Sequence, residues 1–302
     1  ASGGYRRRRG GGKPAMPPPP PYLLLARRAV LAGKLATAER HLAAARGCWK
    51  QRGQRCGFAR WGYQLVAGIV YLERGQPLRA ARSLRASLAA KAKQPTAWLY
   101  LGQALFRAER YRHAAKALRR ARGVGDKKVD YHLLLSRALE RSGQAENARV
   151  ALVAALARFP KEARLLRELA SLYAARGLYL TASRVLRRLW HQSRGAARRR
   201  LALMLADYLR RGGKQREALA ILERTRLAYP RDSEVLSRLA YTYAGAGQPL
   251  AAARLASRAV AASPRLAFFV AEQYRLAGDF ARALRWNGRG GGGDRQARQR
   301  AT

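Results

Sequence analysis

Small and apolar residues recur at helical spacing between Pro95 and Ala121, and the polar pair Glu109 and Arg110 interrupts them. Residues three and four apart share one face of a helix. The residues on the shared faces are Trp98, Leu101, Gly102 and Leu105 before the interruption, and Tyr111, Ala114, Leu118 and Ala121 after it. This pattern predicts two antiparallel helices joined by a turn, with Gly102 and Ala114 where the helices cross.

The same pattern returns along the chain in frames that begin near residues 19, 61, 95, 129, 163, 199, 233 and 264. The eighth position is small in each frame: Ala26, Gly68, Gly102, Ser136, Ala170, Ala206, Ala240 and Ala271. The twentieth position is alanine throughout, and the fifteenth is glycine in every frame but one, where Glu109 stands. Pro160, Pro230 and Pro264 mark where a second helix must stop. Eight helical hairpins are therefore predicted.

These residue types resemble the tetratricopeptide repeat family. The matching residues are Trp98, Leu101, Gly102, Tyr111, Ala114, Ala121 and Pro160, with Tyr71, Tyr173, Tyr243 and Tyr274 at the eleventh position of other frames. The resemblance implies an all-α fold, a right-handed superhelical solenoid of antiparallel helix pairs over residues 22–287. It also implies a binding scaffold, because such repeats carry no chemistry of their own.

Three segments depart from the repeat. Residues 1–21 read as a disordered basic and Pro-rich arm that includes Arg6, Arg7, Arg8 and Arg9, and residues 288–302 read as a Gly/Arg-rich tail. The longer step between the first two frames predicts an inserted loop over 47–60 that holds both cysteines, Cys48 and Cys56. A disulfide there would favour an exported protein, whereas two free thiols would not. The chain begins at Ala1, which fits either removal of an initiator methionine or cleavage of a targeting segment.

The net charge says more about the class of partner than any motif does. The formal net charge is +45, from 62 basic against 17 acidic residues, and all but ten of the basic residues are arginine. Arginine suits bidentate phosphate contacts and stacking on flat rings. A biased genome composition could enrich arginine, but it gives no reason for so few carboxylates. The balance indicates a polyanionic partner.

The basic residues fall at regular places. On the second helices, the twenty-second and twenty-sixth positions share a face, and their cations are Arg40, Arg82, Lys116, Arg120, Arg184, Arg188, Arg224, Arg254, Arg258 and Arg285. A denser stretch adds Arg187, Arg198, Arg199 and Arg200. The first helices offer a competing face with Arg107, Arg137, Arg141, Arg167, Arg210, Arg211, Arg238, Tyr100, Tyr208 and Tyr241. The sequence leaves the choice of face open.

From these observations we expect a non-catalytic scaffold that binds the backbone of nucleic acid, RNA or DNA with single strands favoured, in a multi-copy nucleoprotein or filament. The alternatives are a protein-interaction scaffold for an acidic partner, or an envelope or surface assembly factor that handles an anionic polymer. The aromatic residues Phe268, Phe269 and Trp286 of the last hairpin suggest head-to-tail self-assembly with the apolar start of another copy. Cytoplasmic and exported locations both stay open.

Catalysis is not expected. The four histidines, His41, His113, His132 and His191, fall in different repeats without metal-ligand spacing, and no nucleophile motif or phosphate loop is present. We therefore expect neither a metal nor a cofactor. No run of eighteen apolar residues is present to span a membrane.

Overall fold

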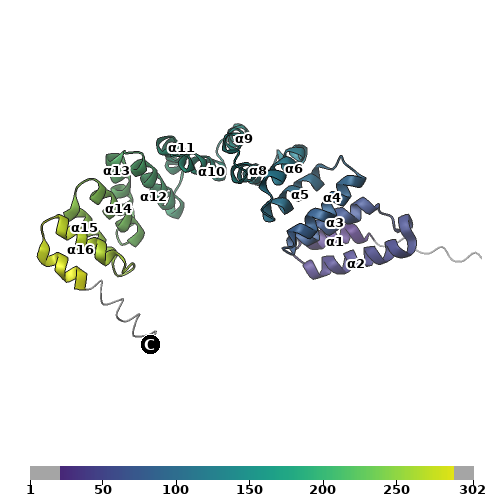
Figure 1. The fold of residues 1–302 in the computed structure, drawn as a ribbon, viewed down its shortest axis with the longest axis horizontal. Helices are drawn as coiled ribbons and strands as arrows, with labels where there is room; N and C mark the ends of the chain where they lie inside the picture. The colour runs from purple at the N-terminus through teal and green to yellow at the C-terminus, as the bar shows by residue number, and fades with distance from the viewer. Residues whose placement is uncertain (1–20, 289–302) are drawn as a thin grey trace, which may run out of the picture. The chain divides into compact units, whose positions relative to one another are not determined.

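The computed structural model describes residues 21–288, and the regular elements within that range are helices. The predicted all-α class is confirmed. The chain divides into two compact units, residues 1–151 and 152–302, with the boundary inside helix α9 (Ala145–Arg158). The expected solenoid over 22–287 is thus distributed over two units, which are described one at a time (Figure 1).

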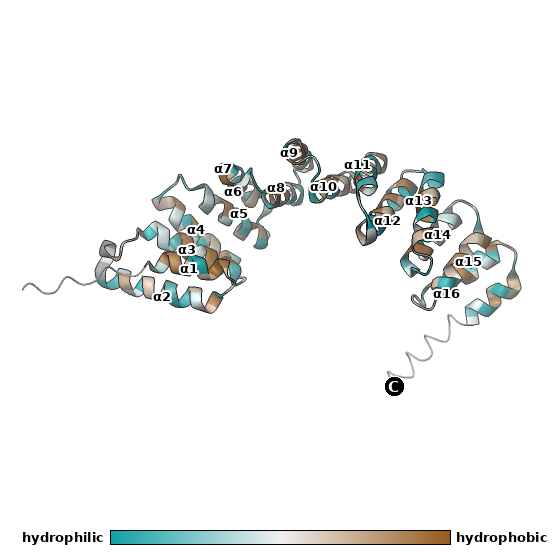
Figure 2. Cartoon of the chain, turned by 180° about the vertical axis from the view of Figure 1, so that it is seen from behind, coloured by the Kyte–Doolittle hydropathy of each residue, from teal (hydrophilic) through white to brown (hydrophobic). Residues whose placement is uncertain are grey.

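In the first unit, each second helix before α9 packs on the first helix of its own hairpin and on the first helix of the next. Figure 2 shows apolar and polar residues alternating along these helices. The helices are α1 (Tyr22–Leu31), α2 (Leu35–Arg52), α3 (Arg60–Glu73), α4 (Pro77–Ala90), α5 (Pro95–Arg107), α6 (Tyr111–Arg120), α7 (Arg122–Gly125), α8 (Val129–Arg141) and the start of α9. The short helix α7 fills a spacer that the repeat pattern leaves without a role.

The second unit repeats this packing. Its core includes the fully buried Leu186, Leu205 and Leu222 from three successive helices. The helices are α10 (Ala163–Ala175), α11 (Tyr179–Gln192), α12 (Gly195–Arg211), α13 (Gln215–Ala228), α14 (Ser233–Gly245), α15 (Pro249–Ala259) and α16 (Leu266–Leu276). A further helix over residues 280–288 completes the last hairpin.

The turn inside each hairpin requires a left-handed residue. Gly33, Gly75, Gly143, Gly177, Gly213, Gly247 and Gly278 all have φ between +71° and +81°. Glu109 occupies the same place in the third hairpin with φ of +59°, and within the described residues it alone has a positive φ without being glycine. Glycine adopts this region without steric cost, whereas a residue with a Cβ does not.

Small residues at the eighth position let the two helices of a hairpin approach. A Cβ built on Gly68 would lie 2.5 Å from Leu84 Cγ and 3.3 Å from the carbonyl oxygen of Ala80, and one on Gly102 would lie 2.5 Å from Leu118 Cγ. These distances are too short for real contacts. The buried leucine of the second helix therefore occupies the volume that a side chain would need.

The prediction of an inserted loop over 47–60 was wrong for its first six residues. Helix α2 continues to Arg52 and is followed by a short 3-10 helix, Gly53–Cys56. Residues 47–52 contain no proline, and after the single Gly47 they have side chains that a helix tolerates. The helix ends only at Gly53, whose φ is +55°. The insertion is thus mainly an extension of the second helix.

Candidate interaction grooves

The first helices use many of their arginines inside the fold. Arg107 donates from Nη1 to the carbonyl oxygen of Leu72 at 2.7 Å, and Arg238 forms an ion pair with Asp207. The guanidinium carbons of Arg141 and Arg211 lie 5.7 Å from the ring centres of Tyr111 and Tyr179, respectively. These cations stabilise contacts between hairpins, although Arg107, Arg141 and Arg211 also remain exposed.

The second helices also carry exposed cations. At the twenty-second and twenty-sixth positions these side chains are exposed: Arg40, Arg82, Lys116, Arg120, Arg184, Arg188, Arg224, Arg254, Arg258 and Arg285. Exposure does not distinguish the two faces, so the choice of the second helices rests on the grooves that their cations line. Several of these residues line grooves between successive second helices, with the intervening first helix as the floor.

One such groove, which we call the α4/α6 groove, lies in the first unit and has a volume of about 830 Å³. Its floor contains Leu88, Leu101 and Leu105, with Ala89, Ala92, Ala117 and Trp98 beside them. Its cationic side chains are Arg85, Lys116, Arg119 and Arg120, and His113 stands with them. No carboxylate is among the residues that line it.

Trp98 is fixed at the edge of the α4/α6 groove. Its indole Nε1 donates to the carbonyl oxygen of Ala92 at 3.1 Å, and the guanidinium carbon of Arg120 lies 4.7 Å from its ring centre. A cation over an indole face is attracted by the ring quadrupole. The pair presents a flat apolar surface and a positive charge side by side.

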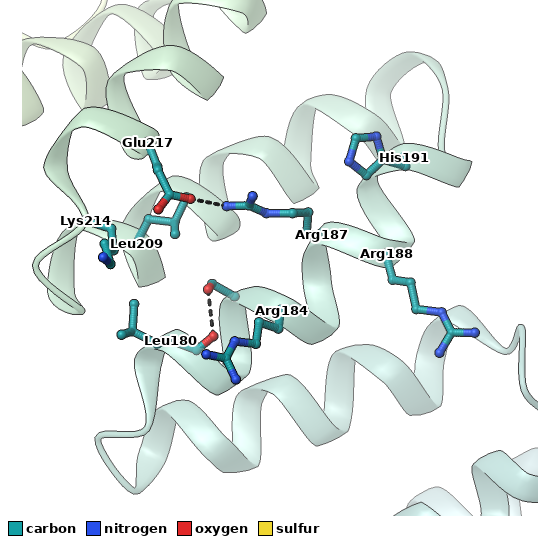
Figure 3. A pocket seen from close by; sticks show the side chains of 9 residues that line it. Leu180, Arg184, Arg187, Arg188, His191, Leu209, Lys214 and Glu217 are labelled. Carbon is teal, nitrogen blue, oxygen red and sulfur yellow. Dashed lines mark hydrogen bonds and ion pairs between the residues drawn. The ribbon is translucent and has the colours of Figure 1, made fainter.

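A second groove, the α11/α13 groove, lies in the second unit, and one part of it is shown in Figure 3. This part has a volume of about 450 Å³ and is lined by Leu180, Ser183, Arg184, Arg187, Arg188, His191, Leu209, Lys214 and Glu217. Arg187 reaches across to form an ion pair with Glu217, whereas Arg188 points away from that carboxylate (Figure 3). Arg184 lies beside Leu180, so charge and apolar surface again adjoin.

The other part of the α11/α13 groove centres on Trp190 and has a volume of about 300 Å³. The guanidinium carbons of Arg198 and Arg224 lie 4.8 Å and 5.8 Å from the Trp190 ring centre. Arg199 also lines this part, but Asp232 accepts hydrogen bonds from its Nε at 2.5 Å and its Nη2 at 2.8 Å. These bonds raise the pKa of Arg199 and lower the pKa of Asp232. Arg199 therefore stabilises the fold through Asp232.

The dense stretch from Arg184 to Arg200 is not one cluster. Arg184, Arg187 and Arg188 line the first part of the α11/α13 groove, and Arg198 and Arg199 line the second. Arg254 and Arg258 are exposed on α15 and line neither groove described above. Arg6, Arg7, Arg8 and Arg9 lie outside the described residues.

Sequence reasoning missed several lining residues. Arg85, His113, Arg119 and Lys214 were not among the candidate site residues, although they border the grooves. A signal was available, because the twenty-fifth position of one hairpin lies across the groove from the nineteenth and twenty-second positions of the next. Combining positions from neighbouring hairpins would have found Arg85 and His113.

Carboxylates are largely neutralised within the chain. Described ion pairs join Arg74 with Glu39, Arg187 with Glu217, Arg199 with Asp232 and Glu234, Arg226 with Glu223, Arg238 with Asp207, Arg275 with Glu272, and Arg282 with Asp279. An exposed pair of this kind contributes little stability. Its consequence here is that an approaching partner meets mainly unbalanced positive charge.

Cys48 and Cys56 are joined in a disulfide with a Cα–Cα distance of 6.0 Å. It connects the extended end of α2 to the 3-10 helix, beside the contact between Trp49 and Phe58, whose ring centres are 5.7 Å apart. The disulfide therefore holds the one irregular junction in place.

The aromatic residues proposed for self-assembly have different environments. Phe269 packs on Tyr241 with ring centres 4.4 Å apart, and Trp286 packs against the core of the last hairpins. Phe268 is exposed. Phe269 and Trp286 therefore support the fold of the unit that contains them.

The residues that the structure describes hold no cluster of three or more histidine, cysteine or acidic side chains placed to bind a metal ion. None of the helices described has the length and apolar content needed to cross a membrane.

A family model described as tetratricopeptide repeat matches residues 65–128 and 203–267. A tetratricopeptide repeat protein from Parabacteroides merdae superposes with a TM-score of 0.53 at 14% identity, over 87% of this chain and 97% of that one. PilF from Pseudomonas aeruginosa gives 0.50 at 15% identity, over 71% and 93%. A chain of the Naa15/Naa10 complex bound to HypK-THB gives 0.56 at 15% identity, over 87% and 39%.

At these identities the likeness shows the fold alone. No curated protein sequence matches the chain. The repeated residues, the helix pairs and the family model agree, and the chain is a tetratricopeptide repeat protein.

Proposed function

We propose that this repeat scaffold binds an acidic segment of a partner protein in the grooves between its second helices. The observation that carries the proposal is the lining of the α4/α6 groove, where four cations and His113 surround leucine and Trp98 and no carboxylate takes part. An amphipathic helix with acidic residues beside an apolar stripe matches both features of that lining. The α11/α13 groove also places cations, Arg184 and Arg188, beside the apolar Leu180, and the Glu217 that lines it is paired with Arg187.

A nucleic acid is the competing partner. The net charge of +45 supports it, since phosphate contacts supply most of non-specific affinity. An apolar floor, however, offers nothing to a sugar-phosphate backbone, and the cations gather at separate grooves. The complex of Naa15/Naa10 with HypK-THB is a protein assembly that includes a fold of this kind. These points favour a protein segment over RNA, DNA or an anionic polysaccharide.

The test uses the full chain and a fluorescein-labelled helical peptide that has glutamates on one face and leucines on the other. Binding is followed by anisotropy at physiological salt. Reversing two charges of the α4/α6 groove, Lys116→Glu with Arg120→Glu, should weaken binding at least tenfold, because both cations lie beside the apolar lining. A matched control, Arg254→Glu with Arg258→Glu, changes the same repeat positions and the same net charge outside both grooves.

The control should lower affinity only by the small, salt-sensitive amount that net charge contributes. Equal losses of peptide affinity in the two double variants would show that net charge alone binds the peptide. That result would contradict binding in the α4/α6 groove. A single-stranded RNA of the same charge serves as competitor. If RNA displaces the peptide at lower concentration than unlabelled peptide does, the nucleic-acid function replaces the one proposed.

A further inference from the structure

Within each unit, the first helix of the following hairpin covers the second helix before it, as α3 covers α2 and α16 covers α15. At the twenty-first repeat position four hairpins carry a small, covered side chain: Ala81, Ala115, Ser183 and Ala253 are exposed by only 4%, 2%, 3% and 0%. In the last described hairpin the same position is Leu284, and it is 72% exposed. In the three remaining hairpins the position is Glu39, Arg149 or Leu219, each of them half-buried. Leu284 is therefore the most exposed large apolar side chain at this position within the described residues.

An aromatic residue at the seventeenth position is covered by the next hairpin in two places, but it is exposed in the last hairpin. Tyr111 contacts Arg141 of the next hairpin, with Arg141 Nη1 3.4 Å from the phenol oxygen. Tyr179 contacts Tyr208 of the next hairpin, with ring centres 6.5 Å apart. The equivalent residue of the last hairpin is Phe280, and it is 64% exposed. Phe280 and Leu284 together form what we call the C-terminal face.

The first helix of the chain carries a complementary surface. Arg141 and Arg211, which cover Tyr111 and Tyr179, stand at the thirteenth position, and the thirteenth position of the first hairpin is Leu31, which is 75% exposed. Tyr208 stands at the tenth position, where the first hairpin has the exposed Arg28. Leu24, on the same helix, is 48% exposed. Helix α1 therefore presents Leu31 in the register that would cover an aromatic seventeenth position.

We propose that the C-terminal face binds helix α1 of a second copy of this chain, as one more step of the hairpin stacking seen inside each unit. Phe280 then lies against Leu31 and Arg28 of the second copy, in the register by which Tyr179 lies against Arg211 and Tyr208. Residues 289–302 contain no large apolar side chain that could cover the face instead. The contact is heterologous, so it leaves one free end of each kind and adds copies head to tail.

Both surfaces are positively charged, so their association should depend on the salt concentration. Arg282 and Arg285 flank the C-terminal face, and Arg27 and Arg28 lie on α1. Like charges repel across the contact, and salt screens this repulsion while the apolar contact persists. Association should therefore strengthen between about 0.05 and 0.5 M salt, opposite to the salt response of a polyanion complex.

The experiment blocks one end at a time. Leu284→Glu blocks the C-terminal face, Leu31→Glu blocks α1, and Leu227→Glu is the control because Leu227 is equally exposed, at 74%, on α13 away from either surface. Sedimentation velocity at 0.5 M salt follows the mass, and circular dichroism verifies that each variant is folded. The wild type and the control should associate as concentration rises, and each blocked variant alone should stay monomeric.

Mixing the two blocked variants is the decisive step, since the mixture still contains one intact C-terminal face and one intact α1. It should form a dimer and nothing larger. A wild type that stays monomeric at all concentrations would overturn the proposal. A mixture that stays monomeric, or a single blocked variant that still self-associates, would overturn it as well.

Discussion

Asp232 holds Arg199 and caps helix α14 with the same carboxylate. Its Oδ1 accepts from Arg199 Nη2 at 2.8 Å and from the backbone N–H groups of Glu234 and Val235 at 3.0 Å each. Both partners of the ion pair are about one fifth exposed. The carboxylate therefore joins α12 to the start of α14 and satisfies two free helix donors at once.

This arrangement predicts an acid-sensitive contribution to stability. The hydrogen bonds from Arg199 lower the pKa of Asp232 in the folded chain. A depressed folded-state pKa stabilises the fold above the unfolded value, about 3.9 for aspartate, and this stabilisation is lost as the pH falls below it. Asp232→Ala should lower the free energy of unfolding at pH 7 by about 1–3 kcal/mol. The difference from wild type should shrink as the pH falls from about 4 through the lowered pKa of Asp232 in the folded chain, as measured by urea unfolding.

Glu272→Gln is the control for Asp232→Ala, because Glu272 also binds an arginine, Arg275, but both side chains are about half exposed. Its effect on unfolding at pH 7 should be close to zero. A loss as large as that of Asp232→Ala would mean that the cap and the partial burial of Asp232 are irrelevant.

Glu109 predicts a stabilising substitution. It adopts the left-handed conformation that seven glycines adopt in the other hairpins. Glu109→Gly should raise the free energy of unfolding by about 0.5–1 kcal/mol, since relief of the left-handed strain exceeds the entropy that glycine adds to the unfolded chain. The reverse change, Gly143→Glu, should destabilise the chain. Urea midpoints of both variants test the prediction, and a destabilised Glu109→Gly would contradict it.

Substitutions at Gly102 and Gly123 test whether the two helices of a hairpin need a small residue where they approach, with Gly123 as the control. A methyl group on Gly102 would meet Leu118, whereas one on Gly123 would meet open space. Gly102→Ala should lower the free energy of unfolding by about 1–3 kcal/mol through overpacking. Gly123→Ala should be neutral or slightly stabilising in the short helix α7. Similar thermal midpoints for the two variants would show that the hairpin tolerates a wider separation than the structure has.

The disulfide predicts a redox-dependent stability of the first unit. Cys48 and Cys56 are eight residues apart, and the chain-entropy estimate for a loop of that size is about 2.5 kcal/mol. Thermal unfolding with and without a phosphine reductant measures the effect, and the Cys48→Ser/Cys56→Ser variant should match the reduced chain. No change on reduction would mean that the extended α2 and its contact with α3 hold the junction without the bond.

The repeat positions made most of the fold predictable. Small residues at the eighth and twentieth positions and glycine at the fifteenth are each required by local geometry, so the frames located the hairpins. The extension of α2 was not predictable from the pattern, because residues 47–52 suit a helix but match no repeat position. The division into two units inside α9 has no counterpart in the sequence pattern either.

The candidate site was predictable only in part. The periodicity placed Lys116, Arg120 and Arg184 on the outer face of the second helices, and the structure finds them exposed there. It could not reveal that Arg199 is held by Asp232, 33 residues away, or that Arg187 is held by Glu217. Positions had to be combined from neighbouring hairpins before Arg85 and Lys116 could be assigned to one groove. Such relationships depend on how neighbouring hairpins pack.

The most direct test of the proposed function compares two labelled peptides of equal length and equal negative charge. One carries leucines at every third or fourth position, and the other carries serines there. Burial of a single leucine is worth about 1.5–3 kcal/mol, so the leucine peptide should bind the full chain at least tenfold more tightly, with the advantage lost in the Lys116→Glu/Arg120→Glu variant. Equal affinity for the two peptides would contradict an apolar groove and would leave unspecific attraction between a cationic chain and any polyanion.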